Sequence, residues 1–396
     1  MTGVLIVKII NFGFNPWSHF WKRNQTLFYL LSNMEQVESA LFVNPAVWAS
    51  DMIKRPQILF SGDPRYALYR SVSPKIKVQT PVYLPYAKKN KTVHAFNQYM
   101  NSAALSLFDS DETILILNDL QADRELVDRA KSKAFLTIFD WSDDFVEFSS
   151  NEEERAVCEQ RCKYYCSIAD VILTINENLR ERAAAINKNA YVVKNATNFF
   201  TIAPPADEEK ITRKIRRHDE TVIGYIGWLN SFRLDLDLIR FVAEQRPAYQ
   251  FVFMGPLSEK TPLGADIPKI KNVHILPPVP YGEYPTCLKA LDVCILPNLI
   301  NAHTSGNNPI KIFDYLASGR PVVATNTSGT ESFSHLLYLA NDKHRFLELL
   351  DHAVQEKSDD LKQNRIETAR RNSWQERFVE VSKVLETYLN KSLVVS

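Results

Sequence analysis

Short, continuously apolar stretches recur along the chain, and stretches with a helical spacing of apolar residues separate them. The first series comprises residues 4–10, 40–43, 113–117, 135–139, 171–175 and 191–193. Such alternation is typical of strands connected by helices, and strands that are apolar throughout suit a parallel sheet covered on both faces. We therefore predict an α/β fold with a doubly wound sheet.

A second series of the same kind comprises residues 222–226, 250–254, 273–275, 293–296 and 321–324. A chain of 396 residues exceeds the size at which a single core usually stops growing. We predict two Rossmann-like domains, 1–204 and 205–372, with an exposed linker in residues 201–220. Residues 373–396 are expected to form an amphipathic helix that packs back toward the N-terminal domain. Ligands of such folds gather in the cleft between the domains.

The overall charge and the cysteines restrict the partners and the compartment. Lys and Arg total 47 against 46 for Asp and Glu, so the chain has no global field that would recruit nucleic acid. Five cysteines, an odd and small number, favour a reducing compartment, and the cytoplasm fits best. No stretch approaches the roughly 18 apolar residues of a membrane span, and the N-terminus lacks the features of a signal peptide. Any membrane contact is therefore expected to be peripheral, at the inner face.

The most informative segment covers residues 303–326. A helix is predicted from Pro309 to about Ser318, ending at Gly319. Lys311 and Asp314 share the face of this helix that is opposite its apolar side. The preceding polar loop supplies hydroxyls and backbone N–H groups at a helix N-terminus, which suits a diphosphate, and Lys311 adds a positive charge. The loop residues concerned are Thr304, Ser305, Gly306 and Asn308.

This segment resembles the GT-B glycosyltransferases, in which a helix of the form P-x-K-x-x-E-Y-L-A-x-G-x-P-V lies against a nucleotide sugar. The resemblance implies a UDP- or GDP-linked donor in the C-terminal domain, with the Asp314 carboxylate accepting the ribose hydroxyls. Asp314 replaces the usual Glu, and Gly306 stands where many members carry a second Glu, so the donor sugar stays open. A capped surface helix with a solvated ion pair is the alternative. The matching residues are Pro309, Lys311, Asp314, Tyr315, Leu316, Ala317, Gly319, Pro321 and Val322.

A strand, a turn and a helix are predicted in residues 222–239. GT-B enzymes commonly open their second domain with a G-x-x-G strand whose backbone N–H groups meet the donor phosphates, and Gly224 and Gly227 match it. The resemblance implies that Gly227 and Asn230 line the donor site, with Arg233 as the basic residue. A tight turn that needs glycine for its backbone alone is an equally good interpretation.

Three carboxylates follow the predicted strand 135–139, namely Asp140, Asp143 and Asp144. The carboxyl ends of strands in open α/β sheets face the ligand crevice, and crowded carboxylates have a raised pKa, which suits a general base. The segment resembles the Y-D-C-V-D-D/E stretch of bacterial polysaccharide transferases related to the teichuronic acid and xanthan pathways, which implies Asp143 as the base. An acidic helix N-terminus is the alternative.

The aromatic and basic stretch 15–25 follows the first strand, where GT-B proteins bind acceptors. Trp17 and Trp21 would stack on sugar rings or rest at a membrane interface, and Arg23 would attract phosphate; local packing of the tryptophans is the alternative. Basic runs at 88–91 and 213–217 would add attraction to a membrane surface.

No histidine motif or zinc pattern is present, and Cys158, Cys162 and Cys166 are expected to be buried small side chains, so we predict no metal site and no bound cofactor. We predict a metal-independent transferase of a hexosyl or related group from a nucleotide sugar. Its acceptor is a glycan, lipid-linked or other hydroxyl compound, in surface polysaccharide synthesis. A nucleotide-sugar 2-epimerase and a non-catalytic glycan- or nucleotide-binding protein are the alternatives.

Overall fold

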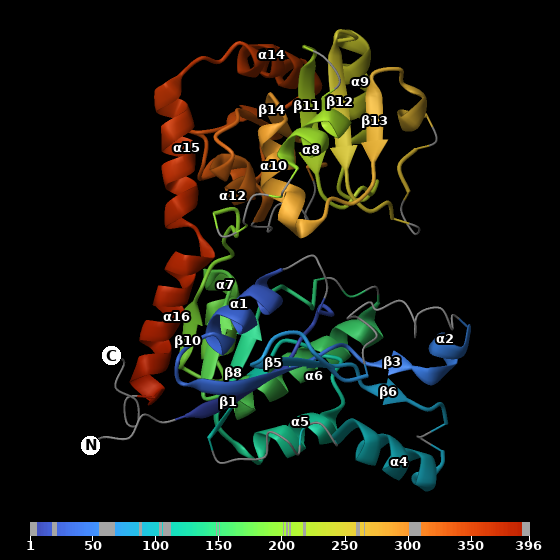
Figure 1. Cartoon of the computed structure of the whole chain (residues 1–396), viewed down its shortest axis with the longest axis vertical. Helices are drawn as coiled ribbons and strands as arrows, with labels where there is room; N and C mark the ends of the chain where they lie inside the picture. The colour runs from blue at the N-terminus through green and yellow to red at the C-terminus, as the bar shows by residue number, and fades with distance from the viewer. Residues whose placement is uncertain are drawn as a thin grey trace. The chain divides into compact units, whose positions relative to one another are not determined.

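The structure is a computed structural model that describes residues 6–17, 22–54, 68–86, 89–102, 105, 112–147, 149, 151–200, 202, 205, 207–216, 219–258, 262–264, 266–300 and 310–389. The chain divides into two compact units. Unit 1 comprises Met1–Lys194 and Arg377–Ser396, and unit 2 comprises Asn195–Glu376. Both are α/β units, as Figure 1 shows.

Unit 1 contains a sheet of eight strands in the order β10-β9-β8-β7-β1-β2-β5-β4. All neighbouring pairs are parallel except β4 and β5. The central strand is β1, and the chain winds outward from it in both directions, as predicted for a doubly wound sheet. The strands are β1 Val7–Phe12, β2 Val37–Val43, β4 Arg70–Ser71, β5 Ile76–Gln79, β7 Thr113–Leu117, β8 Ala134–Trp141, β9 Val171–Thr174 and β10 Ala190–Val192. A small parallel pair, β3 Val47–Trp48 and β6 Val82–Tyr83, stands apart.

Helices cover both faces of this sheet. Leu115 and Phe139 point to the face that packs on Val127 and Tyr165, from α5 and α6. In β2, Leu41 belongs to the same core as Leu115 and Phe139. Its neighbour Phe42 points to the other face of the sheet and packs edge-on against Phe28 of α1. The helices of unit 1 are α1 Arg23–Ser32, α2 Ala49–Lys54, α4 Lys91–Ser102, α5 Arg124–Lys131, α6 Glu152–Ile168, α7 Glu177–Ala184 and the part of α16 Trp374–Leu389 that begins at Arg377.

The prediction of buried cysteines is confirmed for Cys162 and Cys166 but not for Cys158. All five are free, and four are buried. In α6, Cys162 and Cys166 face the core, while Cys158 is partly exposed. Burial raises the pKa of the Cys166 thiol to about 12, which leaves it protonated and unreactive at neutral pH.

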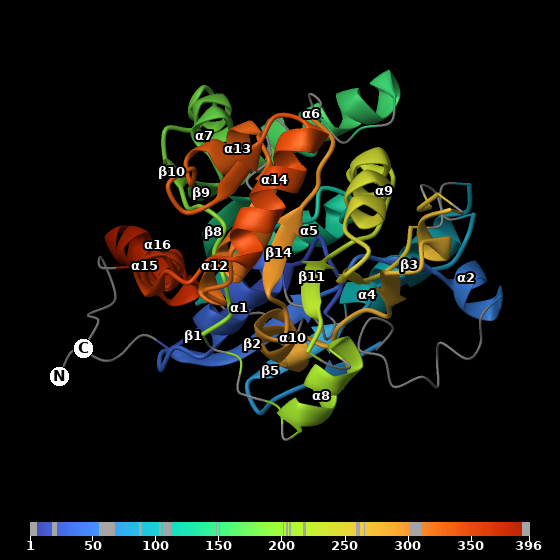
Figure 2. The same cartoon turned by 90° about the horizontal axis from the view of Figure 1, so that it is seen from above.

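Unit 2 contains a sheet of six parallel strands in the order β13-β12-β11-β14-β15-β16. Figure 2 shows α9 and α14 on one side of β11 and β14, with α8 and α10 on the other. The strands are β11 Thr221–Ile226, β12 Tyr249–Met254, β13 Val273–Leu276, β14 Val293–Leu296, β15 Val322–Thr325 and β16 Tyr338–Ala340. The helices are α8 Glu208–Ile215, α9 Leu236–Gln245, α10 Tyr284–Lys289, α12 Ile310–Ala317, α13 Ser328–Glu331, α14 Lys343–Val354 and α15 Asp359–Arg371, with 3-10 turns η3 Ile267–Lys269 and η4 Tyr281–Glu283.

The expectation of an exposed linker in residues 201–220 is wrong where α8 forms. Asp207 caps this helix by accepting a hydrogen bond from the backbone N–H of Lys210 at 2.9 Å. Ile211 and Ile215, four residues apart, are buried in the core of unit 2. The dense charge of the segment lies on the opposite face of an amphipathic helix, which explains why composition alone suggested a loop.

Among the residues that the structure describes, no helix combines the length and apolar character needed to cross a membrane. Within unit 1, the last turns of α16 lie against β10, where the hydroxyl groups of Tyr388 and Tyr191 are 3.1 Å apart.

Candidate functional site

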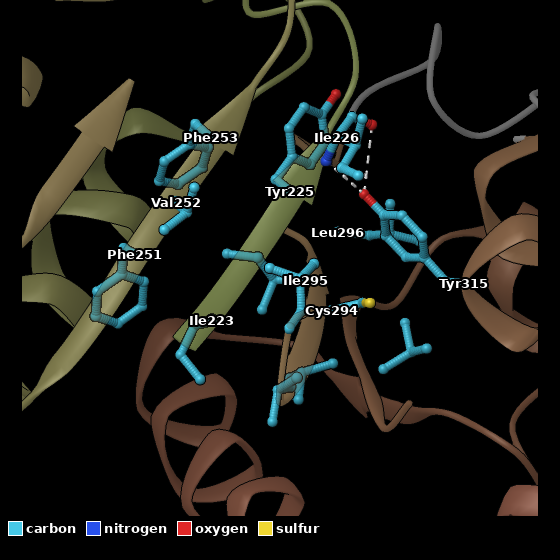
Figure 3. Packing of buried hydrophobic residues seen from close by; sticks show 14 of the residues in the cluster. Ile223, Tyr225, Ile226, Phe251, Val252, Phe253, Cys294, Ile295, Leu296 and Tyr315 are labelled. Atoms are coloured by element: carbon cyan, nitrogen blue, oxygen red, sulfur yellow. Dashed lines mark hydrogen bonds between the residues drawn. The ribbon is translucent and has the colours of Figure 1, made fainter. Parts of the chain in front are cut away.

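In unit 2 the strand order reverses between β11 and β14, and ligands of doubly wound sheets bind at the carboxyl ends of the strands on either side of such a point. Two segments singled out in the sequence reach this place: the turn after β11 and helix α12, which follows β14. The phenol of Tyr315 in α12 accepts a hydrogen bond from the backbone N–H of Ile226 at 2.9 Å (Figure 3). This bond fixes α12 against the end of β11.

Two glycines shape the end of β11 and β12. Gly227 and Gly255 both have positive φ angles, of 155° and 154°. A Cβ atom on Gly255 would overlap the carbonyl oxygen of Gly227, and a Cβ atom on Gly227 would overlap the Nζ and Cε atoms of Lys311. Only glycine fits at either position. The structure therefore brings together Gly227 and Lys311, as the sequence predicted, and adds Gly255, whose only sequence signal was its place directly after an apolar strand.

Lys311 is the cation at this point. Its Nζ atom donates a hydrogen bond to the Tyr225 hydroxyl and lies 4.3 Å from the centre of the Tyr225 ring. Burial, followed by repulsion from Arg233, lowers the pKa of Lys311 to about 7, and attraction to Asp314 opposes this change. Within the part of the chain that the structure describes, neither Lys311 nor Arg233 forms an ion pair with a carboxylate. Among the residues that the structure describes, these two basic side chains lie near each other without a carboxylate at ion-pair distance.

Asp314 lies one turn along α12 from Lys311. Its Oδ1 atom accepts a hydrogen bond from the Thr197 hydroxyl at 2.6 Å, and the Tyr284 hydroxyl also donates to its carboxylate. Burial raises the pKa of Asp314 to about 6, and these hydrogen bonds and the Lys311 charge act in the opposite direction. The carboxylate is therefore held in one orientation before any ligand arrives.

Asn230 shapes the turn that follows Gly227. Its Oδ1 atom accepts a hydrogen bond from the backbone N–H of Arg233 at 2.9 Å, which fixes the backbone of the turn at Arg233. The loop residues predicted to hold a diphosphate, Thr304, Ser305, Gly306 and Asn308, lie outside the described residues.

A cavity of about 550 Å³ opens in unit 2 beside the carboxyl ends of β12 and β13. Its walls are mostly apolar, with three charged side chains. The lining residues are Ile211, Arg213, Lys214, Ile215, Met254, Leu276, Pro277, Pro278, Val279, Pro280, Glu283 and Cys287.

In unit 1, Arg23, predicted to bind the acceptor, and Asp140, predicted to be catalytic, form one ion pair. Arg23 donates to both carboxylate oxygens of Asp140, at 2.7 to 3.1 Å, and also to the carbonyl of Val193 at 2.6 Å. The Nδ2 atom of Asn118 completes the set, 2.8 Å from Asp140 Oδ2. Arg23 and Asp140 are 4% and 0% exposed. This buried ion pair therefore stabilises unit 1.

The other two carboxylates of the cluster have different surroundings. Asp144 forms an ion pair with Arg182 at 2.6 Å, and the Arg182 guanidinium lies over the Trp141 ring. Asp143 is half-buried beside them. A further carboxylate that the sequence did not single out, Asp119, is buried just after β7, and burial raises its pKa to about 6.

Trp17 is a core residue. Its ring is 7% exposed and packs edge-on against Phe28 and Phe42, and its backbone N–H donates to Asn44. The prediction that Trp17 stacks on an acceptor sugar is therefore wrong, because the ring fills the space between α1 and the sheet. Trp21 and Lys88 lie outside the described residues, and the described residues contain no group of three or more His, Cys, Asp and Glu side chains able to hold a metal.

The donor-side geometry agrees with a comparison against known families. Residues 220–355 match the family model "Glycosyl transferases group 1". This part of the chain is a glycosyl transferase group 1 domain. The matched residues lie wholly within unit 2. They include β11, the turns at Gly227 and Gly255, and Lys311, Asp314 and Tyr315 of α12.

One relative by sequence is TuaH of Bacillus subtilis, whose name assigns it to teichuronic acid biosynthesis as a glycosyltransferase. The identity is 24% over 159 residues, and the match spans 39% of this chain and 39% of that relative.

Solved structures show the same fold across nearly the whole chain. Sucrose-phosphate synthase from Thermosynechococcus elongatus superposes with a TM-score of 0.66 and 13% identity, covering 98% of this chain and 100% of that structure. Anabaena HepE in complex with UDP-glucose superposes with a TM-score of 0.64 and 13% identity. This match covers 96% of this chain and 99% of that structure. At these identities the likeness concerns the fold, and the chain has the GT-B fold of two Rossmann-like domains.

Proposed function

We propose that this protein is a glycosyltransferase that moves a sugar from a nucleotide sugar, bound by unit 2, to a hydroxyl group of a glycan or lipid-linked acceptor in surface polysaccharide synthesis. One observation carries the proposal. Lys311 and Arg233 have no ion-pair partner among the described residues. They lie where the strand order of unit 2 reverses, next to Gly227, which has no side chain. An anion is the ligand that this arrangement favours.

The diphosphate of the donor would bind at these two cations. The sugar leaves a nucleoside diphosphate behind, so negative charge grows on the phosphate oxygen as the glycosidic bond breaks. Lys311 and Arg233 would stabilise this charge, and we propose that no metal ion is needed. The donor nucleotide is UDP or GDP; UDP-glucose bound to HepE, which shares the fold, supports UDP. The oriented Asp314 carboxylate would accept hydrogen bonds from the ribose.

The 550 Å³ cavity beside β12 and β13 would hold the nucleoside. Its size lies within the usual range of ligand pockets, and a lining of aliphatic and proline side chains with few polar groups suits a flat base. It opens next to Met254, which precedes Gly255 in the chain.

On unit 1, Asp143 stays the proposed general base for the acceptor hydroxyl, as the resemblance to bacterial polysaccharide transferases implies. Peripheral membrane contact is part of the proposal. The exposed Lys89 and Lys91 adjoin an exposed apolar stripe of α4, formed by Phe96, Tyr99 and Met100, and such a combination suits an anionic lipid surface.

Incubation of the full chain with UDP- and GDP-sugars tests the proposal. We expect one nucleotide sugar to bind and to be consumed when a crude lipid-linked or glycan acceptor is added, with no loss of rate in EDTA. An epimer formed from donor alone would indicate the 2-epimerase instead. Donor binding without turnover across an acceptor panel would indicate a non-catalytic binding protein.

A further inference from the structure

Tyr225 of β11 contacts the end of the Lys311 side chain. It is the penultimate residue of β11 and is fully buried. Its hydroxyl accepts the hydrogen bond from Lys311 Nζ and donates one to the Trp228 carbonyl at 3.3 Å. Its ring face lies toward the same Nζ atom, 4.3 Å from the ring centre. One side chain thus attracts the ammonium both through its oxygen and through its ring.

The other charged groups near Lys311 do not fix its position. Arg233, from the turn after β11, repels the ammonium, and Asp314, from α12 itself, attracts it but is already bound to Thr197 and Tyr284. A lysine side chain is a flexible stem that ends in a point charge, so its place depends on its partners. Gly227 provides room for the end of the Lys311 side chain but has no side chain that could hold it in place.

We infer that Tyr225 is a positioning residue, whose hydroxyl and ring hold the Lys311 ammonium at the point where the donor diphosphate binds. This inference rests on the proposed function. Tyr225 does not touch the donor: it acts through Lys311. Its hydroxyl also ties Lys311 to the carbonyl of Trp228, so the position of the ammonium is coupled to the turn that carries Arg233.

A double-mutant cycle on the full chain distinguishes positioning from a structural role. UDP and GDP affinities are measured by calorimetry for the wild type, Tyr225→Phe, Lys311→Met and the double variant. Tyr225→Phe keeps the ring and the shape of the core. It should weaken binding of the preferred nucleotide by about 10- to 150-fold, the usual effect of losing a hydrogen bond to a charged group. In the Lys311→Met background the same change should alter affinity by less than about twofold.

The matched control is Tyr338→Phe, which removes a tyrosine hydroxyl bonded to Glu356 elsewhere in unit 2. It should leave nucleotide affinity unchanged in both backgrounds. Equal loss from Tyr225→Phe with and without Lys311 would overturn the positioning role. If wild type binds neither nucleotide, the proposed function fails instead, and if Lys311→Met binds as well as wild type, the donor-site assignment fails.

A measurement on the wild type covers the case in which Tyr225→Phe does not fold. The end of the Lys311 side chain lies near an aromatic ring, with Nζ 4.3 Å from the centre of the Tyr225 ring, so its nuclei experience a ring-current shift. In protein labelled with ¹³C-lysine, we expect one lysine Cε–H signal to be displaced from the position of a solvated lysine, to disappear in Lys311→Met and to move on addition of UDP. A Lys311 signal at the ordinary position of a solvated lysine would overturn the inference.

Discussion

The Lys311 ammonium donates a hydrogen bond to the Tyr225 hydroxyl and lies 4.3 Å from the centre of its ring. The two residues come from elements 86 positions apart, β11 and α12, which meet where the strand order of unit 2 reverses. Lys311 is held by the buried Tyr225 side chain and lies next to Arg233 and Gly227. Two basic side chains beside a residue without a side chain favour an anionic ligand.

Lys311→Met should lower kcat/KM for sugar transfer by about 100-fold, because one charge-stabilising donor is lost at the leaving diphosphate. Asp314→Ala should mainly raise the KM for the donor, since it removes the proposed ribose acceptor. Steady-state kinetics with the preferred nucleotide sugar measure both effects. The matched control is Lys343→Met, an exposed lysine of α14 that should be neutral. Unaltered kinetics in both site variants would remove the site assignment.

Donor affinity should fall as the pH rises above about 7. The pKa of Lys311 is lowered to about 7 in the free protein, so its ammonium is present below that pH and lost above it. A diphosphate favours the charged form, so binding above pH 7 requires uptake of a proton, and affinity should fall by up to about tenfold per pH unit. Calorimetry of nucleotide-sugar binding in buffers of different ionisation enthalpy measures the proton uptake. Lys311→Met should abolish it, and an uptake that persists in this variant would contradict the assignment.

Gly227→Ala should abolish donor binding, because the added methyl group would displace the end of Lys311 and its positive φ angle disfavours any side chain. Gly282→Ala is the matched control, since a Cβ atom at that position meets nothing within 4 Å. Nucleotide affinity and thermal unfolding measured on both variants check this. Normal binding by Gly227→Ala would show that the end of the Lys311 side chain is not held against this glycine.

The strands and the donor-side motif could be predicted because each depends on neighbours in the sequence. Apolar runs identified β11 and β14, and the capped pattern around Pro309 identified α12 and its end at Gly319, whose φ angle is 73°. The contacts that give these elements their chemistry could not be predicted in this way. A tyrosine within an apolar strand, such as Tyr225, has the same local pattern whether its hydroxyl meets a lysine or a backbone carbonyl.

The acidic cluster and the aromatic stretch of unit 1 show the same limit more strongly. Asp140 and Arg23 are 117 positions apart, and both looked available for a ligand until the fold paired them. Trp17 follows the first strand, where acceptors bind in similar proteins, yet its ring is needed to fill the core. Composition cannot distinguish a binding side chain from a packing one when both require the same residue type. For α8 the reverse holds, because its surface charge hid two core isoleucines.

Asp140→Asn should destabilise unit 1 by about 3–5 kcal/mol, since it leaves the buried Arg23 charge without its partner. Glu209→Gln, which removes an exposed ion pair with Arg213, should cost at most about 0.5 kcal/mol. Urea unfolding of the two variants gives the comparison. An Asp140→Asn protein that is as stable as wild type but inactive would instead indicate a catalytic carboxylate.

Trp17→Ala should cost about 3–5 kcal/mol, because it opens a cavity between Phe28 and Phe42. Trp48→Ala, at a tryptophan that is 52% exposed in the same unit, should cost far less. Thermal unfolding measures the difference. Loss of acceptor affinity without loss of stability in Trp17→Ala would return this residue to the acceptor site.

The most direct test of the central claim is a crystal structure of the full chain with a UDP- or GDP-sugar bound. The account predicts diphosphate oxygens within about 3 Å of Lys311 Nζ and of the Arg233 guanidinium, the distance of charge-assisted hydrogen bonds. A diphosphate bound elsewhere on the protein, with Lys311 still directed only at Tyr225, would contradict it.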